Sequence, residues 1–122
     1  MGNRFVIQEH TTQEGVHWDL MIEKGGVLAT FRLSQSPEHA RDHAIQAVRI
    51  FDHPLRFLAY EGPVQKGTGK VRIVEGGTCR LLDENEDRMA LDLQGTLLQG
   101  NFTLTRLEGA TWEFARQPQH PA

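Results

Sequence analysis

The strongest constraint on the fold is the close spacing of turns, because short apolar runs alternate throughout with glycine-rich or polar breaks. Residues 16–23, VHWDLMIE, alternate between apolar and polar side chains, which is typical of a strand with one face in a core. Lys24-Gly25-Gly26 then reads as a hairpin turn, and residues 27–33 return as the next strand. We expect an all-β chain of about eight to ten strands with at most one or two short helices. A compact antiparallel β-barrel is favoured over a sandwich because it leaves few exposed edges.

The expected elements fill one domain over residues 1–116, followed by a flexible tail over residues 117–122. Residues 34–44 change character: Ser36-Pro37-Glu38 is typical of a helix start, and a loop is the alternative. A turn is expected at Gly76-Gly77. Strands are expected at residues 4–10, 16–23, 27–33, 46–51, 55–60, 69–75, 78–83, 88–94, 98–106 and 110–115.

Composition restricts the function classes. A formal net charge of −3 does not favour a large basic footprint for duplex DNA, but it allows an enzyme that engages one nucleic-acid end through a local site. No apolar run approaches the roughly 20 residues that span a bilayer, so no membrane partner is expected. Cys79 is the only cysteine and the N-terminus lacks a signal-peptide pattern, so the expected location is cytoplasmic.

Two histidines and an aspartate near the N-terminus form a candidate metal site. Residues i and i+2 of a strand point the same way, so His17 and Asp19 can converge on one ion. His10 comes from the preceding strand and would face the same side if the two strands pair antiparallel. Two imidazoles and one carboxylate leave open coordination positions, which is typical of a catalytic Mn²⁺, Zn²⁺ or Fe²⁺ site. The alternative is three ordinary polar positions on a solvated sheet face.

The remaining histidines and a glycine-rich segment each carry two interpretations. His53, in the sequence Asp-His-Pro, is either a turn residue or a general acid or phosphate contact at the mouth of the barrel. His39 and His43 have helical i, i+4 spacing, for which a solvated helix face is favoured over a ligand pair. Residues 66–70, KGTGK, lack the full spacing of a phosphate loop and predict a glycine-rich hairpin, whose lysines could still contact a phosphate backbone.

The segments QEH, HWDL, DHPL and YEGP, in this order, resemble the 3′-phosphoesterase domain of bacterial DNA ligase D and its short standalone relatives. The resemblance extends over residues 4–114 and implies a compact β-barrel with Mn²⁺ as cofactor. It also implies activity on 3′ ends of DNA or RNA–DNA. Family members remove a terminal ribonucleoside and then the 3′-phosphate, leaving a 3′-hydroxyl for a polymerase or ligase.

The same resemblance assigns roles to residues. By position, the family's metal ligands fall on His10, His17 and Asp19, its active-site glutamine on Gln8, and its phosphate-contacting histidine on His53. Larger members also carry catalytic residues in an N-terminal arm, ahead of the segment that matches here.

Several phosphate-binding positions of the family are altered in this chain. The departures are Met21 and Ile45 where the family has arginines, Gln35 where it has a lysine, and Phe57 where it has a tyrosine. Arginine matters at such positions because its planar fork grips phosphate bidentately. Arg32 is the best substitute, ahead of Arg49 and Arg56, because its strand is expected to pair with residues 16–23.

Three hypotheses follow from these residues. The leading one is a metal-dependent 3′-phosphoesterase in DNA repair, in which His53 stabilises charge or donates a proton, Gln8 orients the site and Arg32 holds phosphate. The second, favoured by the altered phosphate positions, is a non-catalytic metal-binding β-barrel module in a repair or other assembly. The third is a structural barrel without metal. Repair ligases or polymerases are the expected protein partners of the first two.

Overall fold

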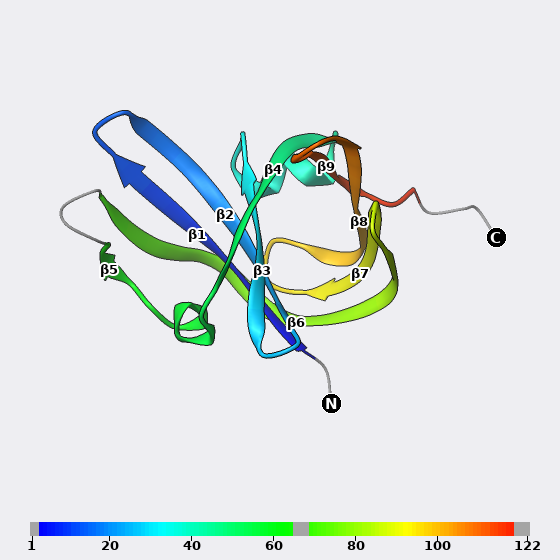
Figure 1. The fold of residues 1–122 in the computed structure, drawn as a ribbon, viewed down its shortest axis with the longest axis horizontal. Coiled ribbons are helices and arrows are strands. Elements are labelled where there is room, and N and C mark those ends of the chain that lie inside the picture. The colour runs from blue at the N-terminus through cyan, green and yellow to red at the C-terminus, as the bar shows by residue number, and fades with distance from the viewer. Residues whose placement is uncertain (1–2, 65–68, 119–122) are drawn as a thin grey trace.

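The strands of the chain close into an antiparallel barrel (Figure 1). The computed structural model describes residues 3–64 and 69–118. The strands are β1 (Asn3–Thr12), β2 (Gly15–Lys24), β3 (Val27–Leu33), β4 (Ile45–His53), β5 (Gly62–Pro63), β6 (Lys70–Asn85), β7 (Arg88–Gln94), β8 (Gln99–Glu108) and β9 (Thr111–Arg116). They form one sheet in the order β1-β2-β3-β4-β9-β8-β7-β6-β5, and β1 also pairs with β6. Eight strands therefore close on themselves and β5 lies outside, which confirms the predicted all-β antiparallel barrel.

The barrel interior is filled by apolar side chains from all eight closing strands. In β2, the predicted apolar face points inward, with Leu20 and Ile22 buried and Trp18 packed at the margin. Burial of these apolar side chains in a closely packed interior stabilises the barrel. Members of this interior cluster include Phe5, Ile7, Leu20, Phe31, Leu33, Leu91, Phe102, Leu104, Trp112 and Phe114.

The outer face of β1, β2 and β3 carries a second, smaller apolar cluster. Val6, Met21 and Leu28 lie buried there, covered by the 3₁₀ helix η2 (Leu55–Leu58). The prediction of a strand over residues 55–60 is therefore wrong. Pro54 precedes a tight helical turn, and the i, i+3 spacing of a 3₁₀ helix directs Leu55 and Leu58 to the same side, onto the barrel wall.

The predicted turn at Gly76-Gly77 is also wrong, because β6 continues through both glycines. A Cβ atom on Gly76 would lie 3.3 Å from the carbonyl oxygen of Phe5, and one on Gly77 would collide with the carbonyl oxygen of Gln94. These glycines permit β1 and β7 to approach β6 closely on its two sides. In this strand glycine marks close backbone approach rather than a chain reversal.

Two of the four register shifts in the described sheet, those in the β3–β4 and β1–β6 pairs, alter which residues face outward. In the β3–β4 pair, Thr30 lies opposite Ile50 and Leu28 lies opposite His53, so β4 has one extra residue between them. This bulge moves His53 to the outer face, although its even spacing from the buried Ala47 would otherwise direct it inward. A similar shift between β1 and β6 follows Ile7 and leaves an extra residue in β6.

The predicted helix start at Pro37 is present, as the 3₁₀ helix η1 (Pro37–Arg41). His39 and His43 are both exposed, and His43 lies beyond the helix, hydrogen-bonded to the Gln35 side chain at 2.8 Å. No helix within the described residues is long and apolar enough to cross a membrane. Residues 65–68 and 119–122, which hold most of the predicted glycine-rich hairpin and of the predicted tail, lie outside the described residues.

Candidate metal centre

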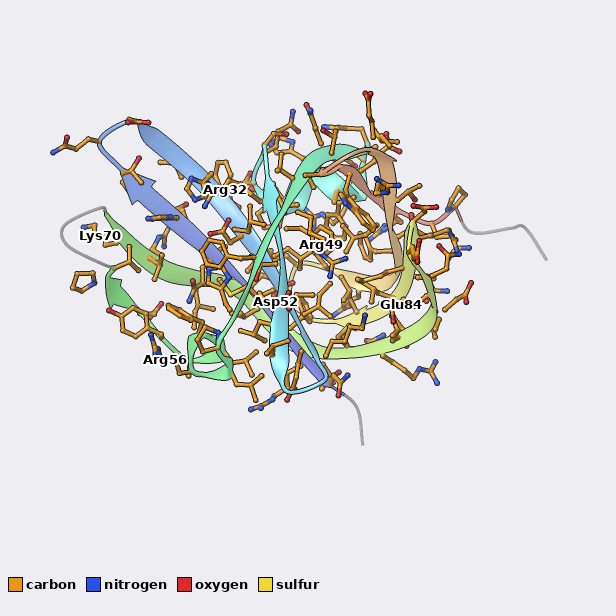
Figure 2. The ribbon with its side chains drawn as sticks, viewed as in Figure 1. Arg32, Arg49, Asp52, Arg56, Lys70 and Glu84 are labelled. Carbon is orange, nitrogen blue, oxygen red and sulfur yellow. The ribbon has the colours of Figure 1, made fainter. Side chains whose placement is uncertain are left out.

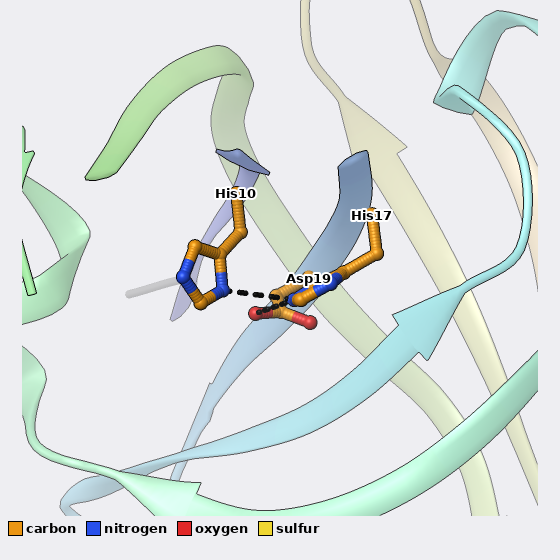
Figure 3. A group of neighbouring side chains, drawn as sticks. All are labelled: His10, His17 and Asp19. Carbon is orange, nitrogen blue, oxygen red and sulfur yellow. Dashed lines mark hydrogen bonds and ion pairs between the residues drawn. The ribbon is translucent and has the colours of Figure 1, made fainter. Parts of the chain in front are cut away.

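The candidate ligands lie on the outer face of the β1–β2 hairpin. The antiparallel register places His10 opposite His17 and Gln8 opposite Asp19, so all four side chains share this face. The side chains of His10, His17 and Asp19 point toward one another (Figure 3). The expected convergence of two adjacent strands on one point is therefore present in the fold.

The distances between the donor atoms suit a small divalent cation. His10 Nδ1 lies 2.9 Å from His17 Nε2, which lies 3.6 Å from Asp19 Oδ2, and the ligand atoms of all three residues lie within 4.8 Å of one another. Nitrogen and oxygen ligands that share a metal at a bond length near 2.1 Å lie about 3.0–3.4 Å apart. The three residues thus fit a cation with small side-chain adjustments, and three protein ligands leave positions open for water or substrate.

Asp19 is held in its charged form despite its burial. Burial alone would raise the pKa of Asp19, but the hydrogen bond with His17 and the charge of Arg32 together outweigh it and lower that pKa. Arg32 Nε lies 3.3 Å from Asp19 Oδ1, and Asp19 is 4% exposed. An ionised carboxylate in a water-poor position is a strong ligand for a cation.

Gln8 connects the hairpin to the segment that covers it. Its side-chain Nε2 donates hydrogen bonds to the carbonyl oxygens of Phe57 and Tyr60, each at 3.0 Å. Since both amide hydrogens are used and the residue is 1% exposed, Gln8 fixes the chain around η2 against the barrel wall.

His53 reaches the same face by way of the β4 bulge. Its Nδ1 lies 2.9 Å from Thr30 Oγ1 and 3.0 Å from the carbonyl oxygen of Phe51, while Thr30 Oγ1 donates to the carbonyl oxygen of Leu28. With both neighbours acting as acceptors, we assign the proton to Nδ1. His53 Nε2 is then the nitrogen left to meet a ligand.

Two hollows adjoin the candidate ligands. A cavity of about 540 Å³ is lined by residues that include Gln8, His10, Asp19, Arg32 and His53. A second hollow of about 660 Å³ lies against the β1–β2 turn and shares His10 and Arg32 with the first. A substrate therefore has open space on both sides of the candidate metal position.

The structure separates the candidate phosphate-binding residues into two groups. Arg32 and Arg56 line the cavity, whereas Arg49 places its guanidinium over the rings of Phe31 and Trp112, 5.3 and 5.8 Å from their centroids. Met21 also lines the cavity, but it is 1% exposed.

Ile45, the second position where the resemblance places a family arginine, lies in the barrel interior. It pairs with Phe114 on β9 and so faces away from the cavity. A cation at this position would point into the apolar interior, so Ile45 is part of the barrel packing in this chain.

Sequence reasoning named Phe57 only as an altered phosphate-binding position and missed Phe51 and Tyr60, which line the cavity with it. For these two the signal was the number of aromatic residues around the Asp-His-Pro segment, which also suits a buried strand. A bulge and a 3₁₀ helix, neither visible in the hydrophobic pattern, bring the three residues to one cavity, where His53 lies between the rings of Phe51 and Phe57.

Comparisons with known proteins match nearly the whole chain. A profile of the DNA ligase D 3′-phosphoesterase domain matches residues 8–106. The multifunctional non-homologous end joining protein LigD of Mycobacterium bovis is 31% identical over 119 residues, covering 91% of this chain and 15% of that relative. The protein of the same name from Mycolicibacterium smegmatis is 30% identical over 125 residues, covering 90% and 16%, and that from Pseudomonas aeruginosa is 27% identical over 113 residues, covering 84% and 13%. The chain therefore spans only a small part of the length of these relatives.

Proposed function

The chain belongs to the family of the DNA ligase D 3′-phosphoesterase domain, as the sequence resemblance predicted, and on this premise we propose that it processes nucleic-acid 3′ ends in DNA repair. The reaction is the metal-dependent hydrolysis of a terminal phosphoester, which removes a 3′-ribonucleoside or a 3′-phosphate from DNA or RNA–DNA. The observation that carries this proposal is the convergence of His10, His17 and Asp19 beside a cavity that Arg32 also lines.

The proposed cofactor is Mn²⁺, with Zn²⁺ as the alternative, held by His10, His17 and Asp19. Mixed nitrogen and oxygen ligation suits both ions. A bound cation would supply charge neutralisation at the phosphoryl group and a more acidic water. Asp19 contributes the negative charge that binds the ion, and its low pKa keeps that charge available at neutral pH.

Arg32 takes the role of phosphate clamp in this proposal. Its Nε is turned toward Asp19, which leaves its terminal nitrogens for a phosphate, and its side chain is 42% exposed at the cavity. A guanidinium held by a buried carboxylate is pre-oriented, so little conformational entropy is lost when it grips an anion. His53 Nε2, which lines the same cavity, stabilises charge on the phosphate or donates a proton to the leaving oxygen.

A 3′-phosphorylated DNA strand in the presence of Mn²⁺ tests the proposal. We expect release of inorganic phosphate that a chelator abolishes, and a loss of about 100-fold or more in the Arg32→Ala variant. Arg41→Ala is the matched control, because Arg41 is exposed on η1, outside the residues that line the cavity. Unchanged activity in Arg32→Ala contradicts the role of Arg32, whereas no release by the wild type contradicts the proposed reaction.

A second candidate function is a non-catalytic metal-binding module in a repair assembly, acting beside a ligase or polymerase. Met21 favours it, because an apolar side chain packed under η2 stands where the family resemblance places a phosphate-binding arginine. Mn²⁺ binding without turnover of any 3′ end would select this alternative over the enzyme.

A further inference from the structure

Phe51 is the most exposed of the large apolar side chains in the described parts of the chain, at 76%. It lies on β4 at the bulge and lines the cavity that contains His10, Asp19 and Arg32. An exposed phenylalanine costs hydrophobic free energy unless something covers it. Because it lines a candidate site, its ring is available to contact a ligand bound there.

One face of the Phe51 ring packs against the ring of His53, which orients it. It stacks on His53 with ring centroids 4.8 Å apart and an interplanar angle of 10°. His53 in turn meets the edge of Phe57 at 5.5 Å, and its Nδ1 is anchored by Thr30. One face of Phe51 is therefore backed by a buttressed ring, and its high exposure leaves the other face open.

The charges around the cavity favour an anionic chain. Arg32 and Arg56 line it, and Asp19 is the only carboxylate among its described lining residues. Figure 2 places Arg32 and Arg56, together with Lys70, in the half of the molecule that holds β1 and β5. Asp52, next to Phe51 in the sequence, is not part of the lining. A ligand that combines a flat apolar ring with phosphates suits both the ring and the cations.

We infer that Phe51, backed by His53, is a stacking platform for the base of the nucleotide that carries the reacting 3′ phosphate. The inference rests on the proposed function and adds a substrate class to it: a single-stranded or frayed 3′ end, whose last base is unpaired. Stacking on an aromatic ring tolerates every base, since each has a flat π-face. The platform therefore holds the end of a strand without reading its sequence, while the phosphate lies toward Arg32.

The test uses the whole chain with Mn²⁺ and a single-stranded oligonucleotide that ends in 2-aminopurine bearing a 3′-phosphate. Stacking quenches this fluorescent base, so binding is read separately from phosphate release. The variants are Phe51→Ala, Phe51→Trp, which restores a π-face, and Leu107→Ala, a control that truncates another exposed apolar side chain (58% exposed). A second oligonucleotide lacks the last base and keeps the phosphate.

We expect Phe51→Ala to weaken binding of the base-bearing end by about 5- to 100-fold and to abolish the quenching. Phe51→Trp and Leu107→Ala should bind nearly as the wild type does. The abasic end should bind the wild type and Phe51→Ala equally weakly.

The platform is overturned if Phe51→Ala binds both ends with the same preference as the wild type. It is also overturned if the substitution changes only self-association measured by sedimentation, which would make Phe51 a protein contact. Phe51-dependent binding without phosphate release supports the platform and contradicts the proposed reaction. Phosphate release with Phe51-independent binding supports the reaction and contradicts the platform, and the absence of both contradicts both.

Discussion

Two buried carboxylates, Asp19 on the outer face and Glu75 at the β6–β7–β8 side of the barrel, are stabilised in different ways. Glu75 accepts hydrogen bonds from the backbone N–H groups of Gly76, Thr96, Leu97 and Leu98 at 2.7–2.9 Å, so both of its oxygens are used by the fold. Asp19 instead meets the side chains of His17 and Arg32, which line a cavity or hollow themselves. A buried carboxylate saturated by backbone groups supports a turn, whereas one surrounded by titratable and cationic side chains is available to a ligand.

The same contrast extends to the other buried polar residues. In the described parts of the chain, the buried polar residues are Gln8, Asp19, Thr30 and Glu75. The first three lie on the outer face around the cavity. The fourth, Glu75, instead lies opposite Ile7 in the β1–β6 pair and binds the turn between β7 and β8. Desolvation of polar groups is thus concentrated where the metal site is proposed.

The largest effect on stability is expected from Glu75→Ala. The substitution leaves four backbone N–H groups without their acceptor, so the free energy of unfolding should fall by about 3 kcal/mol or more. Chemical denaturation measures it, with the exposed Glu108→Ala as control, expected within about 0.5 kcal/mol of the wild type. A loss below about 1 kcal/mol would contradict the structural role assigned to Glu75.

Gln8→Ala should have an intermediate and mainly local effect. Two hydrogen bonds to the carbonyl oxygens of Phe57 and Tyr60 are lost, which lowers the free energy of unfolding by about 1–2 kcal/mol. Hydrogen exchange should accelerate at the amides of Phe57 and Ala59 far more than at Leu91 in the barrel interior. Uniform acceleration at all three sites would show that η2 and the barrel unfold as one unit.

Asp19→Asn should change metal-free stability least among the buried polar substitutions, by less than about 1 kcal/mol, because the amide keeps the shape and one acceptor oxygen. The pKa of Asp19 is lowered in the fold, so its charge adds stability that is present at neutral pH and lost only as the pH falls through that pKa. The Asn variant should therefore lack this acid-dependent loss, which denaturation at acid and neutral pH measures. Thermal unfolding with and without Mn²⁺ tests the metal role of Asp19, since Mn²⁺ should raise the Tm of the wild type only.

The reactivity of Cys79 tests how the barrel interior affects an ionisable side chain. Burial, together with the negative charge of Asp92, raises the pKa of its thiol to about 11, the opposite outcome to that of Asp19. At pH 8 the folded protein should be alkylated by iodoacetamide at roughly one-hundredth the rate of the unfolded chain. Stability should be unaffected below pH 9 and should fall above it, because only the unfolded thiol then loses its proton. Fast alkylation of the folded protein would indicate an open barrel.

The sequence predicted the features that depend on regular strand geometry. Alternation in residues 16–23 and a short turn before them were enough to place His10, His17 and Asp19 on one face, and strand order placed Arg32 beside them. Turn spacing and apolar alternation also predicted many short strands and hence a barrel, which the closed sheet confirms.

Features that depend on irregular backbone could not be predicted in this way. The β4 bulge that turns His53 and Phe51 toward the cavity adds one residue without a sequence signal. Residues 55–58 have strand-like composition, yet they form a 3₁₀ turn after Pro54, with Leu55 and Leu58 packed on the outer apolar cluster. The hydrogen bonds of Glu75 depend on the turn at residues 95–98, which is about 20 residues further along the chain.

The central claim is that His10, His17 and Asp19 hold a divalent cation, and a Mn²⁺ titration followed by electron paramagnetic resonance tests it most directly. Wild-type protein should bind one Mn²⁺, and His17→Ala should weaken that binding by about 100-fold or more. His39→Ala, at an exposed histidine on η1, should leave it unchanged. Equal Mn²⁺ affinity in the wild type and His17→Ala, or loss of binding in His39→Ala instead, would contradict the claim.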